Sequence, residues 1–183
     1  MTTPLRCLIV EDSEDDAQLL LAELRAGGFD VTWERVFTSE TTRAALARAP
    51  WDIVLSDFRM PQFTGLDALA LVRACLVPPP FILVSGTIGE EIAVSAMRAG
   101  ASDYLMKDNL ARLVPAVQRE LRDTAARVAQ RKADAARRAS EEQFRTFFEQ
   151  TNVAWPSPGF PARWRRIRRF VTCSDIRARN SHN

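Results

Sequence analysis

Residues 5–28 read LRCLIVEDSEDDAQLLLAELRAGG, one strand followed by one helix. The run Leu5–Val10 is short and apolar, which is typical of a buried strand. Gly27 and Gly28 end the helix that follows. Four apolar residues of that helix recur at the i, i+3, i+4 and i+7 spacing of a single face: Ala17, Leu20, Leu21 and Leu24. The sequence therefore predicts a βα unit whose connecting loop is acidic and begins with Glu11 and Asp12.

The same alternation continues to about residue 120. Further strand-like apolar runs occupy residues 31–36, 53–56, 81–84 and 101–106. Helical patterns lie between them, at residues 39–49, 66–70 and 92–99, with Ser39 expected to cap the first. Successive parallel strands need right-handed crossovers, which cover both faces of a sheet. The pattern predicts an α/β fold, a doubly wound five-stranded parallel sheet with an extended C-terminal helix.

That last helix begins near Leu110, and no glycine or proline interrupts residues 116–150. Its apolar positions alternate at spacings of four and three for under three heptads: Leu110, Val114, Val117, Leu121, Thr124 and Val128. Such a seam is shorter than the three to four heptads that indicate a coiled coil. Two interpretations stay open, a solvated connector helix and a weak parallel dimer contact.

Three segments are predicted from these patterns. Residues 1–122 form the α/β domain, residues 123–150 a connector helix or short coiled coil, and residues 151–183 a disordered basic tail. Seven of the 25 Lys and Arg residues lie in that tail beside a single acid, Asp175. The tail has no helical or strand periodicity and resembles an out-of-frame translation. The alternative is a basic segment, with Trp155 and Trp164 among its arginines, that binds nucleic acid nonspecifically.

Composition excludes several classes of protein. No apolar run approaches the ~20 residues that span a bilayer, and the N-terminus has no signal-peptide pattern. Cys7, Cys75 and Cys173 are far apart and odd in number, which argues against a disulfide framework or a zinc site. A cytoplasmic protein is therefore expected, without a membrane or a specific nucleic acid among its partners.

Polar residues end four of the five predicted strands. In a doubly wound sheet, functional groups gather beyond the carboxyl ends of the strands. The residues at this edge are Glu11, Asp12, Asp57, Ser85, Tyr104 and Lys107. Each has an ordinary explanation by itself, such as a helix cap for Asp12, a turn residue for Asp57 or a surface charge for Lys107. Their convergence at one edge favours a functional site.

Three carboxylates brought together repel one another unless a cation joins them. A hard ion that prefers oxygen ligands, such as Mg²⁺, suits such a site. A carboxylate can then attack phosphorus as a nucleophile, giving an aspartyl phosphate. Lys107 and the metal would neutralise the transferring oxygens, and Ser85 offers them a hydroxyl donor.

Four motifs resemble the receiver (CheY-like) family of response regulators over about residues 5–122. They are LIVED at residues 8–12, LSDFRMP at 55–61, LVSGT at 83–87 and GASDYLMK at 100–107. The resemblance implies a flavodoxin-like strand order 2-1-3-4-5 and a phosphorelay role with a histidine kinase or histidine phosphotransfer protein as partner. It further implies that the chain is not an enzyme beyond its own phosphorylation and dephosphorylation.

The resemblance also implies residue roles. Asp57 would be the phosphoacceptor, and Ser85 and Lys107 would contact the phosphoryl group. Asp12, Asp57 and the Arg59 carbonyl would ligate Mg²⁺, with Glu11 acting through a metal-bound water. Ser85 and Tyr104 would form the conformational switch. Arg59 and Thr87 would tune the rate of dephosphorylation.

Two departures and two alternatives accompany this interpretation. Glu11 stands where many members have Asp, and Asp108 follows Lys107 where many have a cis proline, so no cis bond is expected there. A flavodoxin-like nucleotide or flavin binder would need a phosphate-cradling loop after the first strand, but that loop is acidic. A non-phosphorylated interaction domain would be expected to lack Asp57 or Lys107.

Outside this domain, residues 140–150 resemble the opening helix of a PAS sensor domain.

Overall fold

The computed structural model describes residues 2–86 and 90–150. Its centre is a five-stranded parallel sheet in the order β2-β1-β3-β6-β7. The strands are β1 (Thr3–Val10), β2 (Phe29–Val36), β3 (Ile53–Ser56), β6 (Phe81–Ser85) and β7 (Asp103–Met106). Because β4 and β5 form a separate hairpin, this is the expected order 2-1-3-4-5. The predicted α/β fold is therefore confirmed.

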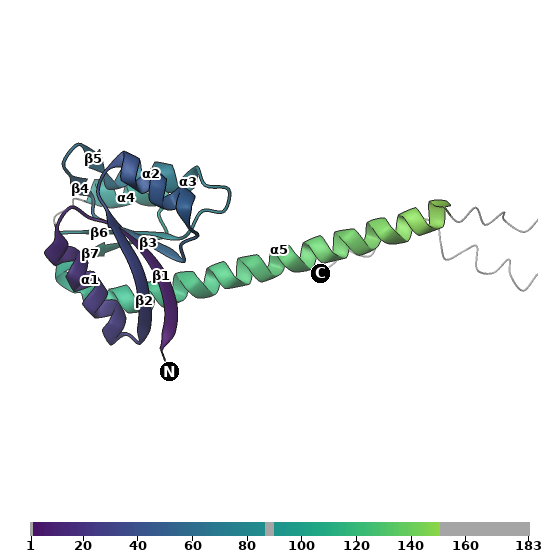
Figure 1. The fold of residues 1–183 in the computed structure, drawn as a ribbon, viewed down its shortest axis with the longest axis horizontal. Coiled ribbons are helices and arrows are strands. Elements are labelled where there is room, and N and C mark those ends of the chain that lie inside the picture. The colour runs from purple at the N-terminus through teal and green to yellow at the C-terminus, as the bar shows by residue number, and fades with distance from the viewer. Residues whose placement is uncertain (1, 87–89, 151–183) are drawn as a thin grey trace, which may run out of the picture. The chain divides into compact units, whose positions relative to one another are not determined.

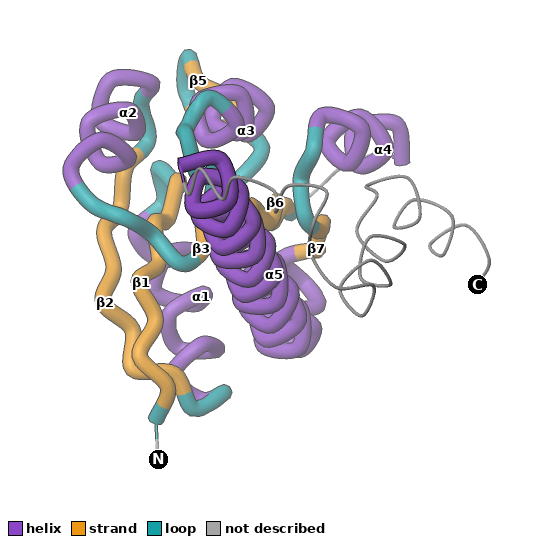
Figure 2. Tube along the Cα trace, turned by 90° about the vertical axis from the view of Figure 1, so that its right-hand side faces the viewer, coloured by secondary structure: helices purple, strands orange, loops and turns teal. Residues whose placement is uncertain are grey.

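The helices cover both faces of the sheet. They are α1 (Glu14–Ala26), α2 (Ser39–Arg48), α3 (Gly65–Arg73), α4 (Glu90–Ala99) and α5 (Leu113–Gln150), with a 3-10 helix η1 (Lys107–Arg112) before the last. Figures 1 and 2 show α1 and the start of α5 on one face and α2, α3 and α4 on the other. Contacts divide the chain into residues 1–131 and 132–183, so the division falls within α5. In the part that the structure describes, no helix combines the length and apolarity needed to cross a membrane.

Two apolar clusters fill the two sides of the sheet. Alternate residues of β1 serve them in turn: Leu5, Cys7 and Ile9 belong to the first cluster, and Leu8 and Val10 to the second. The four apolar residues predicted for one face of α1 are all buried in the first cluster. Continuous apolar strands are thus explained by burial on both faces.

The apolar stripe of α5 faces the domain rather than a partner. Val117 is fully buried, and Leu110, Val114 and Leu121 pack against the first cluster. Of the seam predicted for a dimer contact, only Thr124 and Val128 remain, and Val128 is 39% exposed. Val117 and Leu121, which the dimer interpretation of this seam would place against a second chain, instead help to cover the sheet.

Three local features differ from the prediction. The N-cap of α2 is Thr38, not Ser39, because Thr38 and Thr41 form a reciprocal capping box. The loop after Asp57 contains a hairpin of β4 (Arg59–Met60) and β5 (Phe63–Thr64), whose turn places Gln62 at φ 60. The chain after β7 enters η1 before α5 begins at Leu113. In residues 2–86 and 90–150 all peptide bonds are trans, including the one after Lys107, as expected.

Candidate functional site

The carboxylates of the site are placed by the register of β1 and β3. Val10 pairs with Ser56, so Glu11 and Asp57 leave the sheet side by side. The backbone amide of Asp57 donates to the Val10 carbonyl at 2.8 Å, and the amide of Glu11 donates to the Val36 carbonyl at 2.9 Å. Carboxylate oxygens of Glu11, Asp12 and Asp57 all lie within 4.8 Å of one another. The three acids that the sequence predicted together do converge.

Lys107 reaches this cluster from the end of β7, which is separated from β3 by β6. Ser85 pairs with Met106 at the ends of β6 and β7, so Lys107 emerges at the same edge. Its Nζ lies 2.8 Å from Glu11 Oε2, 2.5 Å from Asp16 Oδ2 and 3.7 Å from Asp57 Oδ2. The lysine is therefore hydrogen-bonded to Glu11 and Asp16, while Asp57 lies just beyond hydrogen-bond distance.

Burial makes the electrostatics of the cluster strong. The side chain of Glu11 is 2% exposed and that of Asp57 is 11% exposed. Burial raises the pKa of Glu11 above its ordinary value, and the hydrogen bonds from Lys107 and the Ser13 amide offset this only in part. Burial alone would lower the pKa of Lys107, but hydrogen bonds to Asp16 and Glu11 raise it. Lys107 thus stays protonated, and the cluster keeps an excess of carboxylates over cations.

Such a donor set fits a hard divalent cation. The oxygens are carboxylates, which Mg²⁺ prefers, and a single ammonium does not balance three acids. Both oxygens of Glu11 are already engaged: Oε1 accepts from the Ser13 amide at 3.1 Å and Oε2 from Lys107. Asp12 and Asp57 are therefore the better placed for direct coordination.

The two residues predicted to form the switch, Ser85 and Tyr104, lie on the paired strands β6 and β7. Ser85 is the last residue of β6 and is 2% exposed. Tyr104 on β7 packs, half-buried, against the second cluster, and its hydroxyl donates to Met106 Sδ at 2.6 Å. Burial and the charge of Asp108 raise the pKa of Tyr104. Arg59 opens β4, two residues beyond Asp57, whereas Thr87 lies outside the described residues.

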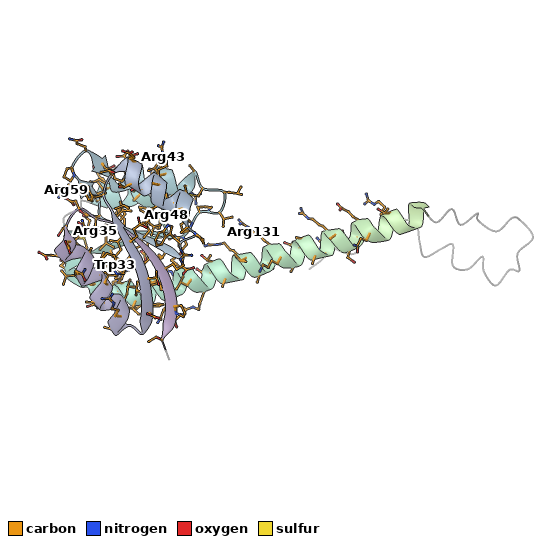
Figure 3. All side chains as sticks on the ribbon, in the orientation of Figure 1. Trp33, Arg35, Arg43, Arg48, Arg59 and Arg131 are labelled. Atoms are coloured by element: carbon orange, nitrogen blue, oxygen red, sulfur yellow. The ribbon has the colours of Figure 1, made fainter. Side chains whose placement is uncertain are left out.

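Arg35 is a site residue that the sequence did not indicate, since the second strand was predicted to end without a candidate. Its Nη1 donates to the carbonyls of Glu11 at 3.2 Å and Asp12 at 3.0 Å. Arg35 lies two residues after Trp33 on β2, and Trp33 packs against the first cluster, so both side chains point to the face that α1 covers. In Figure 3, Arg35 and Arg59 lie toward the same end of the domain. Through these two hydrogen bonds, Arg35 connects β2 to the loop that carries Glu11 and Asp12.

Asp16 is the second residue that the sequence missed as part of the site. It lies in the first turn of α1, where its amide donates to Ser13 Oγ, the N-cap of that helix, at 3.2 Å. An acid in that turn is explained by the helix dipole alone, so only the contact with Lys107 distinguishes it.

Gly65 supports the Asp57 loop from behind. Its amide donates to the Phe58 carbonyl at 2.9 Å. A Cβ at this position would lie 2.6 Å from the Asp57 carbonyl oxygen and 2.5 Å from Leu83 Cδ1. Only glycine lets α3 begin this close to the loop that carries Asp57.

Comparisons with known proteins agree with this fold. The family described as the response regulator receiver domain matches residues 7–118, more than half of the chain, and the chain belongs to it. The chain is 32% identical over 132 residues to the response regulator protein PilR of Pseudomonas aeruginosa, covering 72% of this chain and 28% of PilR. It is 34% identical over 107 residues to the regulatory protein AtoC of Escherichia coli, covering 58% of this chain and 23% of AtoC.

Solved structures show the same fold. The signal receiver domain of a LuxO repressor protein from Vibrio parahaemolyticus superposes with a TM-score of 0.62 at 24% identity, covering 69% of this chain and 96% of that one. The chain thus spans a whole receiver domain but only about a quarter of the length of PilR and AtoC. The chain is a receiver domain of two-component phosphorelay signalling. This family membership argues against the alternative of a flavodoxin-like nucleotide- or flavin-binding module.

Proposed function

We propose that Asp57 accepts a phosphoryl group from the phosphohistidine of a kinase or phosphotransfer protein, in a reaction that depends on Mg²⁺. The observation that carries this proposal is the convergence of Glu11, Asp12 and Asp57 oxygens within 4.8 Å, with Lys107 Nζ 3.7 Å from Asp57. A largely buried carboxylate beside a cation is a suitable nucleophile for phosphorus.

The metal-binding residues would be Asp12 and Asp57 by their carboxylates and Arg59 by its backbone carbonyl. Glu11 would act through a metal-bound water, which is supported by the engagement of both its oxygens with Ser13 and Lys107. Bound Mg²⁺ would neutralise charge on the carboxylates and on the phosphoryl oxygens. Arg35, through its hydrogen bonds to two carbonyls of the loop, would keep Asp12 in place.

The transfer itself would need little from the protein beyond position and charge. An Asp57 carboxylate oxygen forms a bond to phosphorus while the bond from phosphorus to the donor nitrogen breaks, and the electron pair stays with the imidazole. Lys107 would bind one phosphoryl oxygen as a cation and Ser85 another as a hydroxyl donor. The chain would otherwise catalyse only loss of its own phosphoryl group, at a rate set by Arg59 and Thr87.

The response would be conformational. Ser85 and Tyr104 lie on the paired strands β6 and β7, so movement of Ser85 toward the phosphoryl group would be passed to Tyr104 through the pairing of these strands. The receiver would work in the cytoplasm, where its kinase partner presents the phosphohistidine. A weak homodimer through α5 would rest on Thr124 and Val128, because the rest of the seam packs on the sheet.

Intact mass spectrometry after incubation with acetyl phosphate and MgCl₂ tests the proposal. We expect one added phosphoryl group on the wild-type chain, none on Asp57→Asn, and none when the metal is chelated. Asp108→Asn, which removes an acid just beyond the cluster, is the matched control and should label normally. Labelling that persists in Asp57→Asn would show that another residue is the acceptor.

A further inference from the structure

Lys107 has three acidic neighbours, and the most distant is the proposed acceptor. Its Nζ lies 2.5 Å from Asp16, 2.8 Å from Glu11 and 3.7 Å from Asp57. An ammonium group has three protons in a tetrahedral arrangement, and two of these hydrogen bonds are already made. The third proton is left for a phosphoryl group on Asp57, whose Oδ2 lies beyond hydrogen-bond distance, so Asp16 and Glu11 compete with that group for the position of Lys107.

Asp16 is the partner that can be given up. Glu11 is 2% exposed at its side chain, so loss of its ammonium partner would leave a buried carboxylate with only the hydrogen bond from the Ser13 amide. The side chain of Asp16 is 34% exposed, so water can replace the lysine there at little cost. The exchange therefore keeps Glu11 bound to Lys107 and releases Asp16.

The position of Asp16 is fixed independently of Lys107. Ser13 caps α1 and accepts a hydrogen bond from the Asp16 amide at 3.2 Å, which sets the backbone. Three leucines, Leu19, Leu20 and Leu110, line a small pocket together with Asp16 and Lys107. Apolar walls exclude part of the solvent and strengthen the ion pair. Asp16 is thus a preformed competitor for the lysine rather than a carboxylate that follows it.

We propose that Asp16 is a positioning residue that restrains Lys107 in the resting receiver and slows phosphorylation, because the Asp16–Lys107 ion pair competes with the phosphoryl group for Lys107. This inference rests on the proposed phosphorylation of Asp57. An interaction made in the ground state and lost in the transition state raises the barrier. Asp16 therefore lowers the maximal rate of phosphorylation, while the donor concentration that gives half of that rate changes little.

The test measures phosphorylation of full-length protein by acetyl phosphate at saturating MgCl₂, across a series of donor concentrations. Asp16→Asn keeps the shape of the side chain but removes its charge, and its maximal rate should rise roughly two- to fivefold, as expected for a partly exposed ion pair. Asp16→Glu, which restores the charge, should return the rate toward that of the wild type. Asp15→Asn removes the same charge from the adjacent exposed residue and should leave the maximal rate unchanged.

A second measurement needs neither donor nor metal. The ¹⁵N relaxation order parameter of the Lys107 ammonium should fall in Asp16→Asn and stay unchanged in Asp15→Asn. An equal or lower maximal rate in Asp16→Asn, with wild-type protein labelling normally, would overturn the inference while leaving the proposed function intact. A rise of the same size in Asp15→Asn would also overturn it, because the effect would then be one of net charge. Wild-type protein that takes no label would refute the proposed function and this inference with it.

Discussion

Asp12→Asn should stabilise the receiver when no metal is present and should cancel most of the stabilisation that Mg²⁺ provides. A carboxylate oxygen of Asp12 lies within 4.8 Å of carboxylate oxygens of both Glu11 and Asp57. Two unit charges at that distance repel by about 0.9 kcal/mol in a water-like dielectric and by about 3.5 kcal/mol at an effective dielectric constant near 20. Because Asp12 is exposed, the lower figure applies to each of its two repulsions.

The net gain is smaller than the sum of the two repulsions. A carboxylate just before α1 also interacts favourably with the helix dipole, by roughly 0.3–1 kcal/mol, and Asp12→Asn gives this up. We therefore expect the free energy of unfolding to rise by about 1 kcal/mol in chelator. In saturating MgCl₂ the wild-type protein gains about 2.7 kcal/mol for a metal concentration of roughly a hundred times Kd. Asp12→Asn should gain much less, so the order of stability reverses.

Urea unfolding followed by circular dichroism, with chelator and with MgCl₂, measures both differences. Asp15→Asn is the matched control, since it removes one exposed acid from the first turn of α1, outside the carboxylate cluster. Asp15→Asn loses the favourable interaction of the Asp15 carboxylate with the dipole of α1. Its free energy of unfolding should therefore equal that of the wild type or be slightly lower, both in chelator and in MgCl₂. The reasoning fails if Asp12→Asn is no more stable than the wild type in chelator. An undiminished response to MgCl₂ would show that Asp12 is not a ligand.

Four further outcomes are expected. Gly65→Ala should lower the free energy of unfolding by about 1–3 kcal/mol, because the Cβ of the alanine would lie too close to the Asp57 carbonyl oxygen. Gly86→Ala is the control and should leave the free energy of unfolding unchanged, because its Cβ would come no nearer than 4.0 Å to Lys107. The raised pKa of Glu11 means that the folded state holds its proton more tightly than the unfolded state. The stability of the metal-free protein should therefore fall as pH rises from the ordinary value of 4.5 through the folded pKa, and Glu11→Gln should remove this dependence in urea titrations. Arg59→Ala should shorten the lifetime of the aspartyl phosphate, as followed by mass spectrometry, if the Arg59 side chain shields it from water. A chain ending at residue 150 should dimerise only weakly in sedimentation velocity and more strongly with beryllofluoride; a monomer in both states would identify α5 as a bare connector.

The sequence alone was enough to predict the fold and the convergence of the three carboxylates of the candidate site. Apolar runs and helical spacings are local, so the alternation of strands and helices is visible without coordinates. Parallel strands also place their carboxyl ends at one edge, which brings Glu11, Asp12, Asp57, Ser85 and Lys107 together from topology alone. The acidic loop and the single lysine then indicated the chemistry.

Only the tertiary structure decided which partner each of these groups takes. Asp16 and Lys107 are 91 residues apart, and Arg35 lies 23 residues from the Asp12 carbonyl that it binds, so no local pattern links them. The stripe on α5 fits a dimer seam and a core-facing helix equally well in sequence, and burial of Val117 shows that it covers the sheet. The periodicity of a sequence shows that one face of a helix is apolar. It does not show which segment covers that face or which charged side chains form ion pairs, because both depend on distances between segments that are remote in the chain.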